Sequence, residues 1–133
     1  MADYRETVDY ILGIPLFAQK IGKENLSSLL CRLGNPEKAV PAIHVAGTNG
    51  KGSTCRALAQ MLAARGYRVG LFISPHLVSI NERIQINGTN ISDDDFVSAF
   101  ETVKGQFMEH PSFFEVMFAM AAVYFRQQKC DFA

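Results

Sequence analysis

A glycine-rich segment between two regular stretches, residues 44–53 with the sequence HVAGTNGKGS, constrains the fold of this chain more than any other feature. Residues 43–46 are apolar and strand-like, and residues 54–65 favour a helix. The glycines between them allow the backbone to turn sharply and to lie close to a ligand. The pattern therefore predicts a strand, a tight turn and a helix in immediate succession.

The same turn has the groups that a chain of phosphates requires. The first amides of the following helix and its positive dipole end point back at the turn. Its backbone N–H groups would surround phosphate oxygens, Lys51 would reach the outer phosphates, and Ser53 would be a ligand of Mg²⁺. The standard pattern G-x-x-x-x-G-K-[ST] is not met, because Val45 stands at its first glycine and Gly52 separates the lysine from the hydroxyl. The alternative is a turn that binds no ligand. Such a turn would not need as many glycines and hydroxyls as this segment contains.

The composition argues against several classes of protein. The 133 residues correspond to one ordinary domain, and 48% hydrophobic residues suffice for a core. Lysine plus arginine and aspartate plus glutamate number 13 each, so no net charge favours nucleic acid or an anionic membrane. Three cysteines without C-x-x-C spacing suit a reducing compartment and disfavour a disulfide framework or a zinc site. The longest apolar run, 113–125, is shorter than the roughly 20 residues that cross a bilayer.

Helices and strands are expected to alternate along the chain. Periodicity and end signals predict helices at 4–12, 24–33, 53–65, from 93 onward and 112–128, and strands at 42–46, 68–73, 82–86 and 89–91. Residues 130–133 read as a strand that is just beginning. The expected fold is α/β, with a mostly parallel sheet flanked by helices, and we expect the chain to be a piece of a longer protein.

Polar residues outside the turn each have a functional and a structural interpretation. The aspartates at 93–95 follow Ser92, which favours a helix start over a metal site, because consecutive residues diverge around a helix. Ser74 and His76 leave the carboxyl end of a strand, the edge at which α/β sheets bind ligands. His44 is expected near the core.

The segment SFFE at 112–115 fits a capping box before an apolar helix. Glu115 is the only charged residue between positions 113 and 125, so its carboxylate needs a partner. Phe113 and Phe114 are more typical of a core than of a ligand platform.

With these motifs in place, the chain resembles the folylpolyglutamate synthase/dihydrofolate synthase family of the Mur ligase group. HVAGTNGKGS is similar to the phosphate loop of that family, in which the additional Gly52 is normal. LFISPHLVSINERI, residues 71–84, resembles its strand and omega loop. SFFE resembles its aromatic-acid motif, which usually has threonine where this chain has Ser112. The resemblance extends from about residue 20 to the end, in the order of the family.

The resemblance implies a P-loop-type, Mur ligase-like ATP-binding domain that is truncated at its C-terminal side. Residues 1–133 would be its N-terminal part, without the rest of that domain and without the C-terminal glutamate ligase domain. The implied reaction is the ATP-dependent addition of L-glutamate to a pterin or folate carboxylate through an acyl phosphate, with ADP as a product. This piece alone is expected to be inactive. The alternatives are another Mur-like amide ligase and a nucleotide-binding fragment without activity.

The implied cofactors are ATP and Mg²⁺, and the implied substrates are dihydropteroate or a reduced folate and L-glutamate. The resemblance indicates a cytoplasmic enzyme, monomeric at full length, that uses neither nucleic acid nor a membrane. Lys51 is the implied catalytic residue. The implied ATP-binding residues are Thr48, Asn49, Gly50, Lys51, Gly52 and Ser53. The implied Mg²⁺ ligands are Ser53 and Ser74, and the implied pterin or folate residues are Ser112, Phe114, His76, Ile21 and Gly22.

Overall fold

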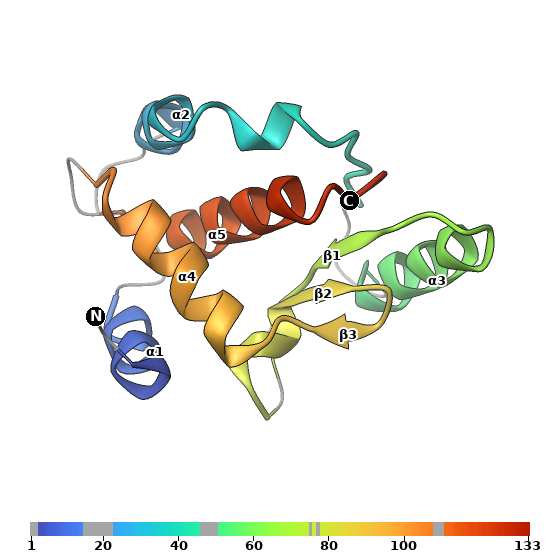
Figure 1. Ribbon diagram of the computed structural model, residues 1–133, viewed down its shortest axis with the longest axis horizontal. Coiled ribbons are helices and arrows are strands. Elements are labelled where there is room, and N and C mark those ends of the chain that lie inside the picture. Colours follow the sequence, from blue (N-terminus) through green and yellow to red (C-terminus); the bar gives the residue numbers. More distant parts are fainter. Residues whose placement is uncertain (1–2, 15–22, 46–50, 75, 77, 108–110) are drawn as a thin grey trace.

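The computed structural model describes residues 3–14, 23–45, 51–74, 76, 78–107 and 111–133 (Figure 1). Its helices, with two short 3₁₀ turns labelled η, are α1 (Tyr4–Leu12), α2 (Lys23–Arg32), η1 (Pro36–Lys38), α3 (Lys51–Ala64), η2 (Ile80–Arg83), α4 (Asp93–Lys104) and α5 (Phe113–Gln127). Within the described residues, no helix combines the length and the apolar character that crossing a membrane requires.

Helix α5 is the centre of the core. Its side chains at Val116, Met120 and Val123 have no exposed surface, and α4 packs along it with Phe96 and Phe100 equally buried. Helices α1 and α2 also contact α5, so α1, α2 and α4 all pack around it (Figure 1). The long apolar run in the sequence is therefore a buried helix, as predicted.

Local side-chain caps define where the helices begin. The hydroxyl of Ser92 accepts a hydrogen bond from the amide of Asp95, which confirms the predicted start of α4. Ser112 and Glu115 form the predicted capping box of α5: the Ser112 amide donates to the Glu115 carboxylate at 2.8 Å, and the Glu115 amide donates to the Ser112 hydroxyl at 3.2 Å. The buried carboxylate thus has the partner that its surroundings require.

Three short strands form an antiparallel sheet in the order β1 (Gly70–Phe72), β2 (Ile84–Ile86) and β3 (Thr89–Asn90). Leu71 pairs with Gln85, and the β2–β3 hairpin turns through Asn87 and Gly88. Both turn residues have positive φ, 49° and 82°, as a two-residue hairpin turn requires. The Asn87 side chain also accepts a hydrogen bond from the Val69 amide at 2.8 Å, which attaches the turn to the start of β1.

Parallel pairing occurs where the chain returns after α5. The Ala133 amide donates to the Pro41 carbonyl at 3.0 Å, and the Ile43 amide donates to the Ala133 carbonyl at 2.8 Å. On the other side, the Gly70 amide donates to the Phe132 carbonyl at 2.8 Å. Residues 132–133 therefore lie between the extended residues 41–43 and β1 and run parallel to both. The sequence predicted extended backbone here but neither its neighbours nor its direction.

The expected mostly parallel sheet is therefore only partly present in these residues. The parallel part rests on 132–133, whereas the regular ladder of β1, β2 and β3 is antiparallel. The reason is that the Asn87–Gly88 hairpin adds two antiparallel strands at one edge. Residues 130–133, in contrast, provide only a few residues that can pair with the parallel segments on either side.

Cys130 is buried in this part of the fold, and burial raises the pKa of its thiol to about 11, with Arg68 lowering it and Asp131 raising it. We expect an aromatic disulfide reagent at pH 8 to modify the exposed Cys31 rapidly and Cys130 at least about 100-fold more slowly, because the thiolate is the reactive form. The measurement is the release of the coloured thiol with and without urea in Cys55→Ser, which removes the partly exposed third cysteine, and in Cys55→Ser with Cys31→Ser. Equal rates for both cysteines in the native chain would contradict the burial of Cys130.

Candidate nucleotide and substrate site

The phosphate turn leads into the first turn of α3. Thr48, Asn49 and Gly50 lie outside the described residues, as do Ile21 and Gly22. Helix α3 begins at Lys51, two residues earlier than expected, so Gly52 and Ser53 belong to its first turn. The amides of a first helical turn have no partner within the helix, and Ser53 is exposed there. The described residues thus place a hydroxyl beside amides that can donate to an anion.

Gly52 has open space around it as far as the described residues are concerned. A Cβ added at Gly52 would find the Arg56 guanidinium, at 3.9 Å, as its nearest neighbour in the described part of the chain. Glycine inside a helix costs about 1 kcal/mol relative to alanine. Because packing does not demand glycine at this position, the absent side chain leaves room for a ligand beside the helix start.

The loop after β1 is held in place by its own polar side chains. The Glu82 carboxylate accepts hydrogen bonds from the amides of Val78 and Ser79, at 2.9 and 2.8 Å, and completes a capping box at η2. The buried Asn81 side chain donates to the Ile91 carbonyl at 2.7 Å. Tyr4 on α1 donates its hydroxyl proton to the same side chain. The loop is therefore anchored to the hairpin and to α1.

Arg83 joins this loop to the sheet and to α5. Its carbonyl accepts from the Ile73 amide at 3.0 Å, and its guanidinium carbon lies 4.9 Å from the centre of the Phe113 ring. Its Nε donates to Nδ1 of His76 at 2.8 Å. Burial, and then the positive charge of Arg83, lower the pKa of His76, whereas Glu82 acts in the opposite direction. Sequence reasoning missed Arg83 as a site residue, although it lies within the quoted NERI motif.

Three aromatic rings meet where α5 faces the end of β1. The ring centres of Phe72, Phe114 and Phe118 are 5.9–6.0 Å apart, and Phe114 remains 50% exposed. Phe114 is therefore not a core residue, whereas Phe113 is buried. Ser112 is buried, and its hydroxyl oxygen accepts the capping hydrogen bond described above.

The structure connects some of the described candidates. His76 is linked through Arg83 to the start of α5, where Ser112 and Phe114 lie, and Ser74 is exposed two residues after the end of β1. Residues 41–43, which run parallel to 132–133 and through them to β1, precede the phosphate turn and Ser53 in the chain. Carboxyl ends of parallel segments meet at the same edge, where open α/β sheets bind ligands. His44 differs from its prediction: it is exposed, because residues 43–45 border a cavity.

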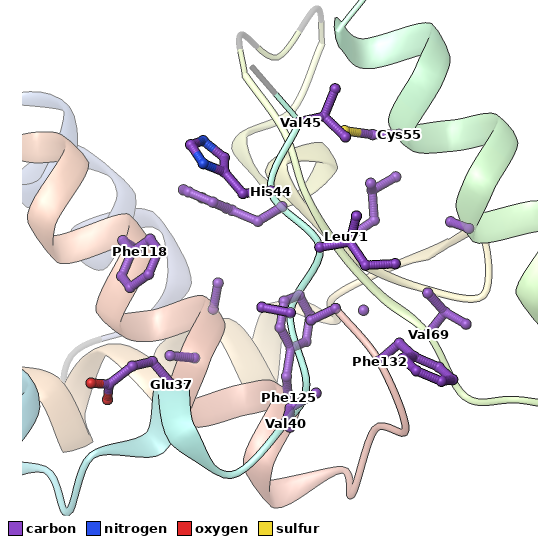
Figure 2. Close-up of a pocket in the computed structure, with 18 of the residues that line it drawn as sticks. Glu37, Val40, His44, Val45, Cys55, Val69, Leu71, Phe118, Phe125 and Phe132 are labelled. Carbon is purple, nitrogen blue, oxygen red and sulfur yellow. The ribbon is translucent and has the colours of Figure 1, made fainter.

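That cavity has a volume of about 520 Å³ and lies between α3 and α5 (Figure 2). Its walls are mainly apolar, with Val45, Leu58, Leu71 and Phe118 among the lining residues. Backbone N–H and C=O groups alternate in direction along a strand. In the described residues, the edges of 43–45 and of β1 that have no neighbouring strand therefore face each other across the cavity. Its mainly apolar lining does not suit a triphosphate.

Comparisons with known proteins show which family the chain belongs to. The chain is 40% identical over 137 aligned residues to the dihydrofolate synthase/folylpolyglutamate synthase of Bacillus subtilis, an alignment covering 97% of this chain and 32% of the relative. The crystal structure of folylpolyglutamate synthase from Thermotoga maritima is 41% identical, with a TM-score of 0.91 over 98% of this chain and 32% of the other. This chain belongs to the folylpolyglutamate synthase/dihydrofolate synthase family.

The family membership also gives the fold class. A folylpolyglutamate synthase solved in complex with AMPPCP and folate is 38% identical and has a TM-score of 0.93 over 99% of this chain and 34% of that structure. The α/β, Mur ligase-like fold predicted from the sequence is thereby confirmed. The chain spans about a third of the length of the relatives that it matches. A scan against models of known protein families gives no match.

Proposed function

We propose that this chain supplies the phosphate-binding and pterin-binding part of an ATP-dependent ligase that adds L-glutamate to a pterin or folate carboxylate. The observation that carries the proposal is the overlap of nearly the whole chain with a synthase that binds AMPPCP, a non-hydrolysable ATP analogue, and folate together. Two features of this chain are consistent with such ligands: the open space at Gly52 and the half-exposed ring of Phe114.

The proposed reaction joins a carboxylate to an amine in two steps. A carboxylate oxygen attacks the γ-phosphorus of ATP, the bond to the β-phosphate oxygen breaks, and ADP leaves. The amino group of glutamate then attacks the acyl phosphate, inorganic phosphate leaves, and the amine loses a proton. Negative charge is redistributed over phosphoryl oxygens in the first step, so positioned amides and cations lower its barrier.

The residues of this chain have distinct proposed roles in that reaction. Residues 48–53 bind the ATP phosphates, with their amides at the start of α3 and with Lys51 as the catalytic cation. The exposed hydroxyls of Ser53 and Ser74 fit a Mg²⁺ ion, which prefers oxygen ligands. Mg²⁺, when bound, would neutralise charge on the phosphoryl oxygens. The open space at Gly52 gives the phosphates access to the helix start.

The proposed pterin site lies at the start of α5. The exposed face of Phe114 provides a surface for a flat heterocycle, and its contacts with Phe72 and Phe118 keep the ring in place. Ser112, His76 and residues 21–22 are the proposed polar and backbone neighbours. We place the intact enzyme in the cytoplasm as a monomer, acting on small molecules and on neither nucleic acid nor a membrane. The balanced charge of this chain supports that proposal.

A thermal-shift experiment tests the nucleotide site in the chain itself. Saturating ATP with Mg²⁺ is expected to raise the Tm by several degrees, because a ligand held at 100 times its Kd stabilises the folded state by about 2.7 kcal/mol. Dihydropteroate is expected to raise it further, whereas a UDP-sugar, the alternative substrate type of a Mur-like ligase, is not. Chelation of Mg²⁺ is the control for the metal. An unchanged Tm with ATP and Mg²⁺ would count against the proposed nucleotide site.

A further inference from the structure

The hydrogen bond between Arg83 and His76 determines which nitrogen of the imidazole carries a proton. Arginine is a donor only, and its Nε lies 2.8 Å from Nδ1 of His76. Nδ1 must therefore present its lone pair to the arginine. A neutral imidazole has one protonated nitrogen, which leaves the proton on Nε2.

We infer that Arg83 is a positioning residue that holds His76 as the neutral Nε2–H tautomer and directs this N–H towards an oxygen or nitrogen acceptor of the bound substrate. The pairing of the two side chains rests on their geometry alone. The identification of the acceptor as part of a pterin or folate rests on the proposed function.

Arg83 is suited to this role because both its main chain and its guanidinium group are held in place. Its main chain is bonded to Ile73 at the end of the β1–β2 ladder. Its guanidinium lies over the ring of the buried Phe113, which restricts the plane in which the N–H groups point. A lysine at this position would retain the charge but would lack the planar group that stacks and donates together.

His76, in contrast, depends on Arg83 for its orientation. It lies in the loop between β1 and η2, only partly buried, and its imidazole accepts a hydrogen bond from Arg83. The rest of the loop is held by Glu82 through the amides at 78 and 79. Arg83 thus links the imidazole to Phe113 at the start of α5, next to the half-exposed Phe114.

The tautomer limits the chemistry that His76 can perform. A protonated Nε2 donates a hydrogen bond but has no lone pair for a metal ion, and Nδ1 is used by Arg83. His76 would therefore recognise a carbonyl oxygen, a carboxylate oxygen or an unprotonated ring nitrogen. It would add direction to the binding of a heterocycle without adding a positive charge.

Nitrogen-15 NMR of the chain at pH 8 tests the pairing directly. We expect a through-hydrogen-bond coupling between Arg83 Nε and His76 Nδ1, with Nδ1 unprotonated. We expect Arg83→Lys to remove the coupling and to leave a mixture of tautomers. Arg68→Lys is the matched control, because the Arg68 guanidinium donates to the Gln128 carbonyl at a distant position. A protonated Nδ1, or the absence of the coupling in the wild-type chain, would overturn the inference.

Dihydropteroate titration tests the role of the free N–H. His76→Gln places an amide N–H near Nε2, whereas His76→Asn places its amide near Nδ1 and lacks the outer donor. One neutral hydrogen bond corresponds to an affinity change of about 3- to 10-fold. We expect a loss of that size in His76→Asn and in Arg83→Met, and near wild-type affinity in His76→Gln. Equal affinities in all four proteins would overturn the substrate contact.

The two failures can be told apart. If the wild-type chain does not bind dihydropteroate, the proposed pterin site is wrong and the substrate contact is overturned with it. The Arg83–His76 pairing is decided independently by the nitrogen coupling.

Discussion

Replacement of Gly70 with alanine is expected to destabilise the fold by about 1–3 kcal/mol, as overpacking of a filled core does. A Cβ at this position would lie 2.6 Å from Cδ1 of Phe125 and 2.7 Å from two further atoms of the same ring. Phe125 is 4% exposed and belongs to the core around α5, so its ring has little room to move. Urea unfolding followed by circular dichroism measures the change in the free energy of unfolding.

Gly105→Ala is the matched control for this substitution. Gly105 ends α4 with φ near −61°, and its added Cβ would meet its nearest neighbours, carbonyl oxygens of its own helix, at 3.5 Å. This variant is expected to be neutral or slightly more stable, because alanine reduces the freedom of the unfolded chain. Phe125→Leu is expected to relieve part of the Gly70→Ala effect. Wild-type stability in Gly70→Ala would show that α5 does not pack on β1 as described.

The largest functional effect is expected for Lys51→Ala. In a protein that carries this chain together with the remaining length of its relatives, turnover is expected to fall by about 10²–10³-fold, as it does when one stabilising group is lost from a charged transition state. The proposed physical reason is that the ammonium group offsets charge on the β- and γ-phosphates as the phosphoryl group is transferred. The measurements are ADP release at saturating substrates and the Kd for ATP with Mg²⁺.

Lys38→Ala is the control for the loss of one positive charge, since Lys38 is exposed in η1, away from the start of α3. It is expected to leave turnover within about twofold of wild type, because a surface charge far from the reacting atoms is screened. Full nucleotide affinity and turnover in Lys51→Ala would refute the proposed phosphate site and would leave the proposed reaction supported by similarity alone.

The parts of the fold that depend on near neighbours in the chain could be predicted. The limits of α1 agree with the prediction because an amphipathic stretch ends at Gly13. The starts of α4 and α5 agree because a serine three residues before an acidic residue caps a helix regardless of the rest of the protein. The Asn87–Gly88 turn agrees because both residues tolerate positive φ.

Contacts between distant segments could not be predicted in the same way. His44 is exposed, although an apolar strand suggested burial, because only residues 41–43 pair with Ala133 and residues 43–45 border a cavity. The side-chain pair of Arg83 and His76 depends on a stack with Phe113, 30 positions further along the chain. No periodicity or spacing contains that information.

By itself, the amino-acid sequence determined the order of the elements, the caps, the hairpin and the motifs of the family, because each depends on residues within about one helical turn of one another. Only the tertiary structure decided which edges pair, that 132–133 lies between residues 41–43 and β1, and that Arg83 orients His76 beside α5. The physical reason is that backbone pairing and side-chain stacking between remote segments depend on how the helices pack around α5, which is a property of the whole core.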